Sequence, residues 1–487
     1  MKLRVKISLI FLLLLGAVLR LIPYFLNHSL SLDEASLAVN ITDRGFLGLL
    51  HPLIYQQVAP VLFLWIEKAT ILLLGNSEQS LRLQPLLCGL LCLPLIYRLT
   101  KTLSGNITAG LIALFLFATS TVLIDYANEV KQYEGDVFCA LCLLNLVFDA
   151  SFTANNKRFI VLALAGSVSF FLSNVTVLVV FSICIYYLFT YRVTVFKKPL
   201  LLLMFACWGI SFMVYYLLFI AHHPLRAFMV NYWQFAFMPL HVFSAGYWVW
   251  MYGKFLSLFK FYSLPFLAVF ILSAILFIVK RQWLFLFLLL FPLALHFMVS
   301  GLKLYPYETR LMLYLMAFIT PVIAIGIVEL IPVFTRLITG YGTAVLLMLL
   351  VYSLIAQLVN THYPFSKEEI KQSIDCINLN KVSGQKIYVY EGANHAANYY
   401  LRLQRISPKE NLIWGTANWN GNKNENCYND ICKLNGYVWL LFSSVYPADE
   451  SCIINRITQS HIPILKTFKN NGSSAYLIIL NGSTHPE

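Results

Sequence analysis

The sequence has 487 residues, of which 59% are hydrophobic and only 12% are charged, with a mean hydropathy of +0.72. A water-soluble domain usually carries about 25% charged residues, so this composition excludes a large soluble enzyme and a disordered chain. It predicts a polytopic membrane protein. The net charge of +13 lies mostly in short loops between apolar runs, where it indicates membrane topology and not nucleic-acid binding.

The apolar segments predict an α-helical protein with about eleven transmembrane helices. The first follows a basic N-terminus and has no convincing small-x-small cleavage site, so we expect it to remain as an uncleaved span. The stretch 159–191 is too long for one span, and Ser173-Asn174 is the expected break. The predicted spans are 7–26, 81–100, 107–124, 136–151, 159–173, 174–191, 199–220, 262–279, 282–300, 310–331 and 338–359.

Segment 60–74 decides the topology. It is about 15 residues long and carries Glu67-Lys68 in its middle, whereas a span needs roughly 20 apolar residues and disfavours central charges. If this segment lies on the outer surface, every Lys/Arg cluster in the loops falls on the cytoplasmic side, as the positive-inside rule requires. We therefore predict an outer interfacial helix, a cytoplasmic N-terminus and an extracytoplasmic C-terminus.

The first outer loop carries a capping-box pattern, Ser31-Leu-Asp33-Glu34. It places Asp33 and Glu34 in the first turn of a helix, where free N–H groups and the helix dipole favour ionised carboxylates. The alternative is that both acids serve only to cap the helix. Their position in a long loop at the membrane surface makes them candidates for acid–base chemistry.

Two further groups of polar residues fall on the same predicted face. The loop at 125–136 holds four acids and Lys131 in a short segment, with Glu129 and Tyr133 beside it. The alternative reading is a solvated turn. The segment at 301–310 ends on Arg310, which can hold a phosphate in bidentate fashion. Tyr305 and Tyr307 precede it, and a snorkelling arginine with aromatic-belt tyrosines is the alternative.

Carboxylates, a fixed cation and aromatic rings around one water-facing cavity suit a reaction in which an acid accepts a proton and a phosphate departs. A phosphate-linked substrate at an outer face is expected to be lipid-linked. A divalent metal ion held by the acids is a further possibility, and the sequence leaves the metal unknown. Two other classes stay open: a transporter or lipid flippase without covalent chemistry, and a structural partner of an envelope-synthesis complex.

Several segments in order along the chain resemble bacterial GT-C glycosyltransferases, in the branch akin to protein O-mannosyltransferases and the lipid A aminoarabinose transferase. They are SLDEASLAVNI, FLWIEK, YANEVKQYEGDV, YPYETRLMLYL and KIYVYEGANHAANYY. The resemblance implies transfer of a sugar from a polyprenyl-phosphate donor to an envelope acceptor at the outer face of the bacterial cytoplasmic (inner) membrane. It implies Asp33 as the catalytic base, with Glu34 beside it. It matches Glu129 and Lys131 to positions in the second acidic loop of that group. It matches Arg310 to the arginine at the entry to one of the group's last spans.

The composition changes after residue 359, and we divide the chain into a transmembrane glycosyltransferase domain at 1–359 and a soluble domain at 360–487. Strands are expected at 386–390, 437–442 and 475–480, with helices at 367–378, 394–405 and 448–460, which together predict a small extracytoplasmic α/β domain. We see no catalytic pattern in it. Its four cysteines predict at least one disulfide, since an even set in an oxidising compartment usually pairs; they are Cys376, Cys427, Cys432 and Cys452.

Overall fold

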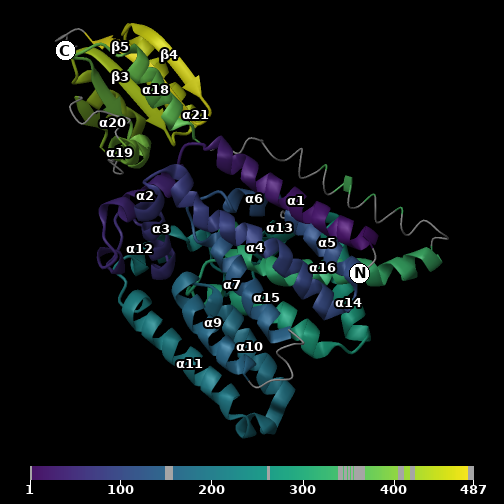
Figure 1. The fold of residues 1–487 in the computed structure, drawn as a ribbon. Helices are drawn as coiled ribbons and strands as arrows, with labels where there is room; N and C mark the ends of the chain where they lie inside the picture. Colours follow the sequence, from purple (N-terminus) through teal and green to yellow (C-terminus); the bar gives the residue numbers. More distant parts are fainter. Residues whose placement is uncertain are drawn as a thin grey trace.

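The structure is a computed structural model of the chain. It describes residues 3–148, 157–259, 264–337, 368–403, 411–416 and 423–480, with a few residues between 344 and 355. The described chain folds into a large helical part and a small sheet part (Figure 1).

The helices of the large part follow the predicted spans closely. The break expected at Ser173-Asn174 is present, because α9 ends at Leu172 and α10 begins at Thr176. The last predicted span, 338–359, lies largely outside the described residues. The helices are α1 (Leu3–Leu26), α2 (Leu32–Asp43), α3 (Val61–Leu74), α4 (Glu78–Ser104), α5 (Ile107–Thr119), α6 (Thr121–Tyr126), α7 (Tyr133–Phe148), α9 (Arg158–Leu172), α10 (Thr176–Tyr191), α11 (Pro199–Tyr215), α12 (Arg226–Tyr232), α13 (Ala245–Phe259), α14 (Leu264–Val279), α15 (Trp283–Gly301) and α16 (Met316–Leu337), with a 3-10 turn η5 (Thr309–Leu315) before α16.

Length and composition separate these helices into classes. Among the described residues, six helical segments are long and apolar enough to cross a membrane, and three shorter apolar helices accompany them. The polytopic helical fold is therefore confirmed, while the number of spans stays a prediction. Helix α3 has 14 residues and is in neither group.

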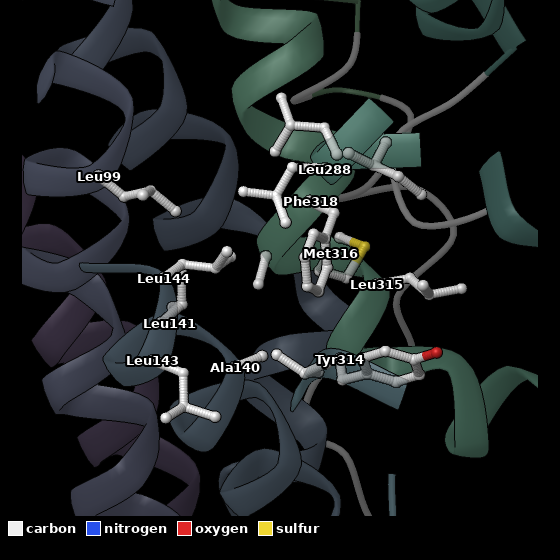
Figure 2. Close-up of a cluster of buried hydrophobic side chains, with 14 of the residues drawn as sticks. Leu99, Ala140, Leu141, Leu143, Leu144, Leu288, Tyr314, Leu315, Met316 and Phe318 are labelled. Atoms are coloured by element: carbon white, nitrogen blue, oxygen red, sulfur yellow. The ribbon is translucent and has the colours of Figure 1, made fainter. Parts of the chain in front are cut away.

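The core of the helical part lies between α4, α7 and the η5–α16 segment. Figure 2 shows Leu141 and Leu144 of α7 facing Met316 and Phe318, with Leu99 of α4 nearby. All five side chains are at most 1% exposed. Packing within a membrane depends on close fit, since lipid is as apolar as the side chains themselves.

The sheet part has five strands in the order β2-β1-β3-β5-β4. Its inner strand β3 pairs in parallel with β1 and antiparallel with β5, and helices pack on both faces, so the predicted α/β layer is confirmed. The three predicted strands and the three predicted helices are present; α20, β2 and β4 were not predicted. The elements are α18 (Ile370–Asn380), β1 (Lys386–Val389), α19 (Asn394–Arg402), β2 (Leu412–Trp414), α20 (Lys423–Cys432), β3 (Gly436–Ser443), α21 (Pro447–Gln459), β4 (Ile464–Asn470) and β5 (Ser473–Leu480).

The disulfide prediction is wrong for this structure. All ten cysteines lie in the described part of the chain, and none of them forms a disulfide. Cys427 is buried against the hydroxyl of Tyr388 at 3.7 Å, and Cys432 and Cys452 are exposed on separate helices. An even cysteine count in the domain therefore does not imply a covalent link, and it carries no argument about the compartment.

The sheet part sits on the first loop of the helical part, with α19 against α2 (Figure 1). Glu369 bonds His28 at 2.6 Å and Ser29 at 3.2 Å, so its carboxylate joins the sheet part to the first loop. Arg402 holds Asp43 through two bonds of 2.6 Å.

The contact between the sheet part and the first loop constrains the membrane topology. Two non-spanning segments that touch lie on the same side of a membrane, so an even number of crossings separates the first loop from the sheet part. The ten spans predicted after the first loop meet this condition. A crossing by α3 would add an eleventh, so the contact favours the prediction that α3 is interfacial.

Candidate active site

Helix α2 positions the two acids of the first loop. The predicted capping box is present, and the carboxylate of Glu34 accepts a bond of 3.0 Å from the backbone N–H of Ser31. This arrangement fixes where α2 begins, and Asp33 consequently projects from its first turn.

Glu34 is enclosed at 3% exposure and is saturated with contacts. Arg82 of α4 donates to both of its oxygens at 3.0 Å, and the backbone N–H of Val130 adds a third donor at 3.0 Å. The carboxylate thus joins the first loop, α4 and the second loop. Glu34 therefore links these three segments, while the prediction of Asp33 as the catalytic base with Glu34 beside it stays untested.

Sequence reasoning did not single out Arg82, which lies in the first turns of the largely apolar helix α4. Besides holding Glu34, its guanidinium donates to the backbone carbonyls of His28 at 2.7 Å and Ser29 at 3.2 Å. The signal that could have found it is the cost of a charge near a membrane, which usually has a partner.

Asp33 contacts Arg310, which lies 277 positions later in the sequence. The guanidinium Nη1 lies 2.7 Å from Asp33 Oδ2, and the side chains stay 24% and 39% exposed for Arg310 and Asp33. Arg310 comes from η5 and also lies over the ring of Trp233, 5.0 Å from its centroid. The pair is therefore accessible to substrate while being held on one side by an aromatic face.

Lys131 brings a second cation to this site. It is 6% exposed and donates to the side-chain oxygen of Gln57 at 2.7 Å. Burial lowers the pKa of Lys131, and the carboxylates of Asp33 and Glu129 oppose that lowering. Glu129 is itself 5% exposed. The second loop thus supplies an enclosed amine and carboxylate next to the Asp33–Arg310 pair.

The three predicted tyrosines fall in different environments. Tyr133 is 5% exposed and packs edge-on against Tyr126 at 5.3 Å. Tyr305 is half-buried and packs beside His296 at 5.5 Å. Tyr307 is fully enclosed and stacks on Phe297 at 4.3 Å, and its contact with a substrate stays a prediction.

An ion pair next to Arg310 was not predicted. Lys254 of α13 bonds Glu308 at 2.6 Å, and Glu308 also accepts from the backbone N–H of Thr309 at 3.1 Å. Burial acts to raise the pKa of Glu308, but the bonds from Lys254 and Thr309 outweigh it and hold the pKa below its usual range. This pair fixes the start of η5 and hence the place of Arg310.

No group of three or more His, Cys, Asp or Glu side chains with an arrangement suited to a metal ion occurs among the described residues. The second-loop carboxylate of Glu129 lines a small recess with Arg82, Glu34 and Asn128. The divalent metal stays an untested prediction.

This chain is similar to a known protein family and to several solved structures. Residues 58–218 match the family model described as Dolichyl-phosphate-mannose-protein mannosyltransferase. No curated protein sequence matches the chain. Among solved structures, ArnT from Cupriavidus metallidurans bound to undecaprenyl phosphate superposes with a TM-score of 0.54 at 11% identity, over 96% of this chain and 97% of that one. The apo form of ArnT gives 0.52 at 12% identity, over 95% and 97%.

The archaeal oligosaccharyltransferase AglB from Archaeoglobus fulgidus, in complex with an inhibitory peptide and a dolichol-phosphate, superposes with a TM-score of 0.51. Its identity is 11%, over 98% of this chain and 74% of that one. At such identities the likeness establishes the fold. The chain therefore has the fold of the GT-C class of membrane glycosyltransferases, with the mannosyltransferase family match confined to residues 58–218.

Proposed function

We propose that this protein transfers a sugar, a hexose or pentose, from a polyprenyl-phosphate-linked donor to an envelope acceptor at the outer face of the bacterial cytoplasmic membrane. The acceptor would be a glycolipid, a polysaccharide or a protein. The observation that carries the proposal is the Asp33–Arg310 contact of 2.7 Å. It unites a carboxylate and a guanidinium that are both only partly buried, in a fold shared with structures that hold undecaprenyl phosphate and dolichol-phosphate.

In the proposed reaction the donor phosphate draws Arg310 away from Asp33. A guanidinium binds a phosphate in bidentate fashion, and a carboxylate released from a cation accepts a proton more readily. The acceptor hydroxyl then gives its proton to Asp33, and its oxygen attacks the anomeric carbon.

As the new bond forms, the bond between the anomeric carbon and the phosphate oxygen breaks, and its electron pair leaves on the polyprenyl phosphate. Arg310 stabilises that charge, and Lys131 contributes from the enclosed side. A single displacement from the face opposite the phosphate inverts the anomeric configuration. Preorganised donors of this kind contribute roughly 3–4 kcal/mol each to transition-state stabilisation.

The test is incubation of the purified full-length chain, in lipid nanodiscs, with a panel of radiolabelled polyprenyl-phosphate sugars and an envelope extract as acceptor. Release of polyprenyl phosphate with label in the extract supports the proposal, and NMR of the product reports its anomeric configuration. If no donor in the panel is consumed, while labelled lipid moves between leaflets of proteoliposomes, the protein is a flippase and the proposal fails.

A further inference from the structure

The sheet part reaches the first turns of α2 through one side chain. His395 of α19 places its Nδ1 2.6 Å from the hydroxyl oxygen of Ser36. Ser36 lies three positions after Asp33, which puts the two residues on the same side of α2. Burial lowers the pKa of His395 and the carboxylate of Asp33 opposes that lowering, in keeping with the closeness of the two groups.

The hydrogen bonds of Ser36 determine the imidazole tautomer. The Ser36 hydroxyl donates its one hydrogen to the carbonyl of Leu32 at 2.6 Å. It must therefore accept from His395, whose Nδ1 carries the hydrogen. The neutral ring then has an unprotonated Nε2.

His395 also contacts a strained segment of the first loop. Its ring lies 4.1 Å from the ring of Tyr55, and Asn398 donates to the Tyr55 hydroxyl at 3.0 Å. Tyr55 and Gln56 both have left-handed backbones, with φ of +59° and +55°. Such conformations are unfavourable for residues other than glycine and persist only where surrounding contacts enforce them.

This strained segment leads directly into the active site. The residue after Gln56 is Gln57, whose side-chain oxygen holds Lys131 at 2.7 Å. Contacts from α19 therefore act on two parts of the site, namely the first turns of α2 that carry Asp33 and the 55–57 segment that holds Lys131.

We infer that His395 is a positioning residue through which the soluble domain completes the transferase site. It fixes the part of α2 that carries Asp33 and the 55–57 segment that binds Lys131. The inference rests on the proposed function. It gives the domain a part in turnover, although its sequence carries no catalytic pattern.

Three variants at position 395 and one control separate positioning from simple docking. His395→Asn keeps a donor close to the place of Nδ1, His395→Gln moves the donor to the place of Nε2, and His395→Ala removes it. Asp43→Ala breaks the contact with Arg402 at the far end of α2 and leaves the Ser36 and Tyr55 contacts in place, together with the bonds from Arg402 to Asn398.

For sugar transfer by the full-length chain in nanodiscs, we expect His395→Ala to lower kcat by about 10- to 100-fold with little change in the donor KM. His395→Asn keeps the bond to Ser36 but not the ring contact with Tyr55, so it should recover part of this loss. His395→Gln should resemble the Ala variant, and Asp43→Ala should lose less than about threefold. Equal losses in His395→Ala and Asp43→Ala, or no rescue by Asn, would overturn the inference.

Hydrogen exchange of the 52–58 backbone gives a readout that needs no turnover. We expect faster exchange there in His395→Ala and in His395→Asn, because both variants lack the ring that contacts Tyr55, and wild-type rates in Asp43→Ala. If wild type transfers no sugar, the proposed function fails while the exchange data still decide whether His395 holds the segment. Unchanged exchange in His395→Ala would contradict the positioning role.

Discussion

At the scale of single residues, adjacent acids in one helical turn have different tasks. Asp33 is 39% exposed on its side chain and faces Arg310, whereas Glu34 is 3% exposed and bound to Arg82 and two backbone amides. Two carboxylates in neighbouring positions thus have different surroundings, because the helix turns one side chain towards open space and the next into the protein.

This divergence predicts that two neighbouring substitutions destabilise the protein to very different extents. Glu34→Ala leaves the Arg82 cation enclosed without its counter-charge, and removal of one partner of a buried ion pair costs roughly 3–5 kcal/mol. Asp33→Ala removes an exposed partner and should cost less than about 1 kcal/mol. Thermal unfolding in a mild detergent should show a large loss of Tm for Glu34→Ala alone. A Tm loss for Asp33→Ala equal to that of Glu34→Ala would contradict the assignment.

At the scale of elements, the start of η5 depends on an ionised Glu308. Because its folded pKa is lowered, the Glu308–Lys254 contact contributes stability above the ordinary glutamate pKa of about 4.3. That contribution is lost as the pH falls through the lower pKa of the folded state.

Glu308→Gln should therefore lower the free energy of unfolding by roughly 1 kcal/mol at pH 7, and the difference from wild type should shrink as the pH falls below about 4. Thermal unfolding between pH 3 and 8 measures this. Glu425→Gln is a matched control, since its pair with Arg456 lies on the surface of the sheet part. A difference that grows towards low pH would contradict the sign.

The elements of this fold could largely be predicted from the sequence, because apolar periodicity and length specify a helix in a membrane. Predicting the site was harder. The cations Arg82 and Lys254 join residues 48 and 54 positions away, and no local pattern encodes such a contact. Strand β4 was missed because its sequence, ILKTFKN, has no regular alternation of polar and apolar residues and is little buried, as expected of an edge strand.

At the scale of the whole molecule, the first loop and the sheet part share one side of the membrane. Free, exposed Cys432 and Cys452 make the side testable. We expect a membrane-impermeant maleimide to label both in intact spheroplasts without reductant. A Lys198→Cys variant, in a loop predicted to be cytoplasmic, should gain label only after lysis. Labelling of Cys432 and Cys452 only after lysis would place the site inside and contradict the proposed topology.

The most direct measurement is the single-turnover rate of sugar transfer by Asp33→Asn beside Asp43→Asn, with saturating lipid-linked donor in nanodiscs. Both acids lie on α2 and both face an arginine, but only Asp33 faces Arg310. If Asp33 is the base, its variant should lose about 100- to 10,000-fold with donor still bound, while Asp43→Asn should stay within about threefold of wild type. Wild-type transfer by Asp33→Asn, or equal losses in both variants, would contradict the account.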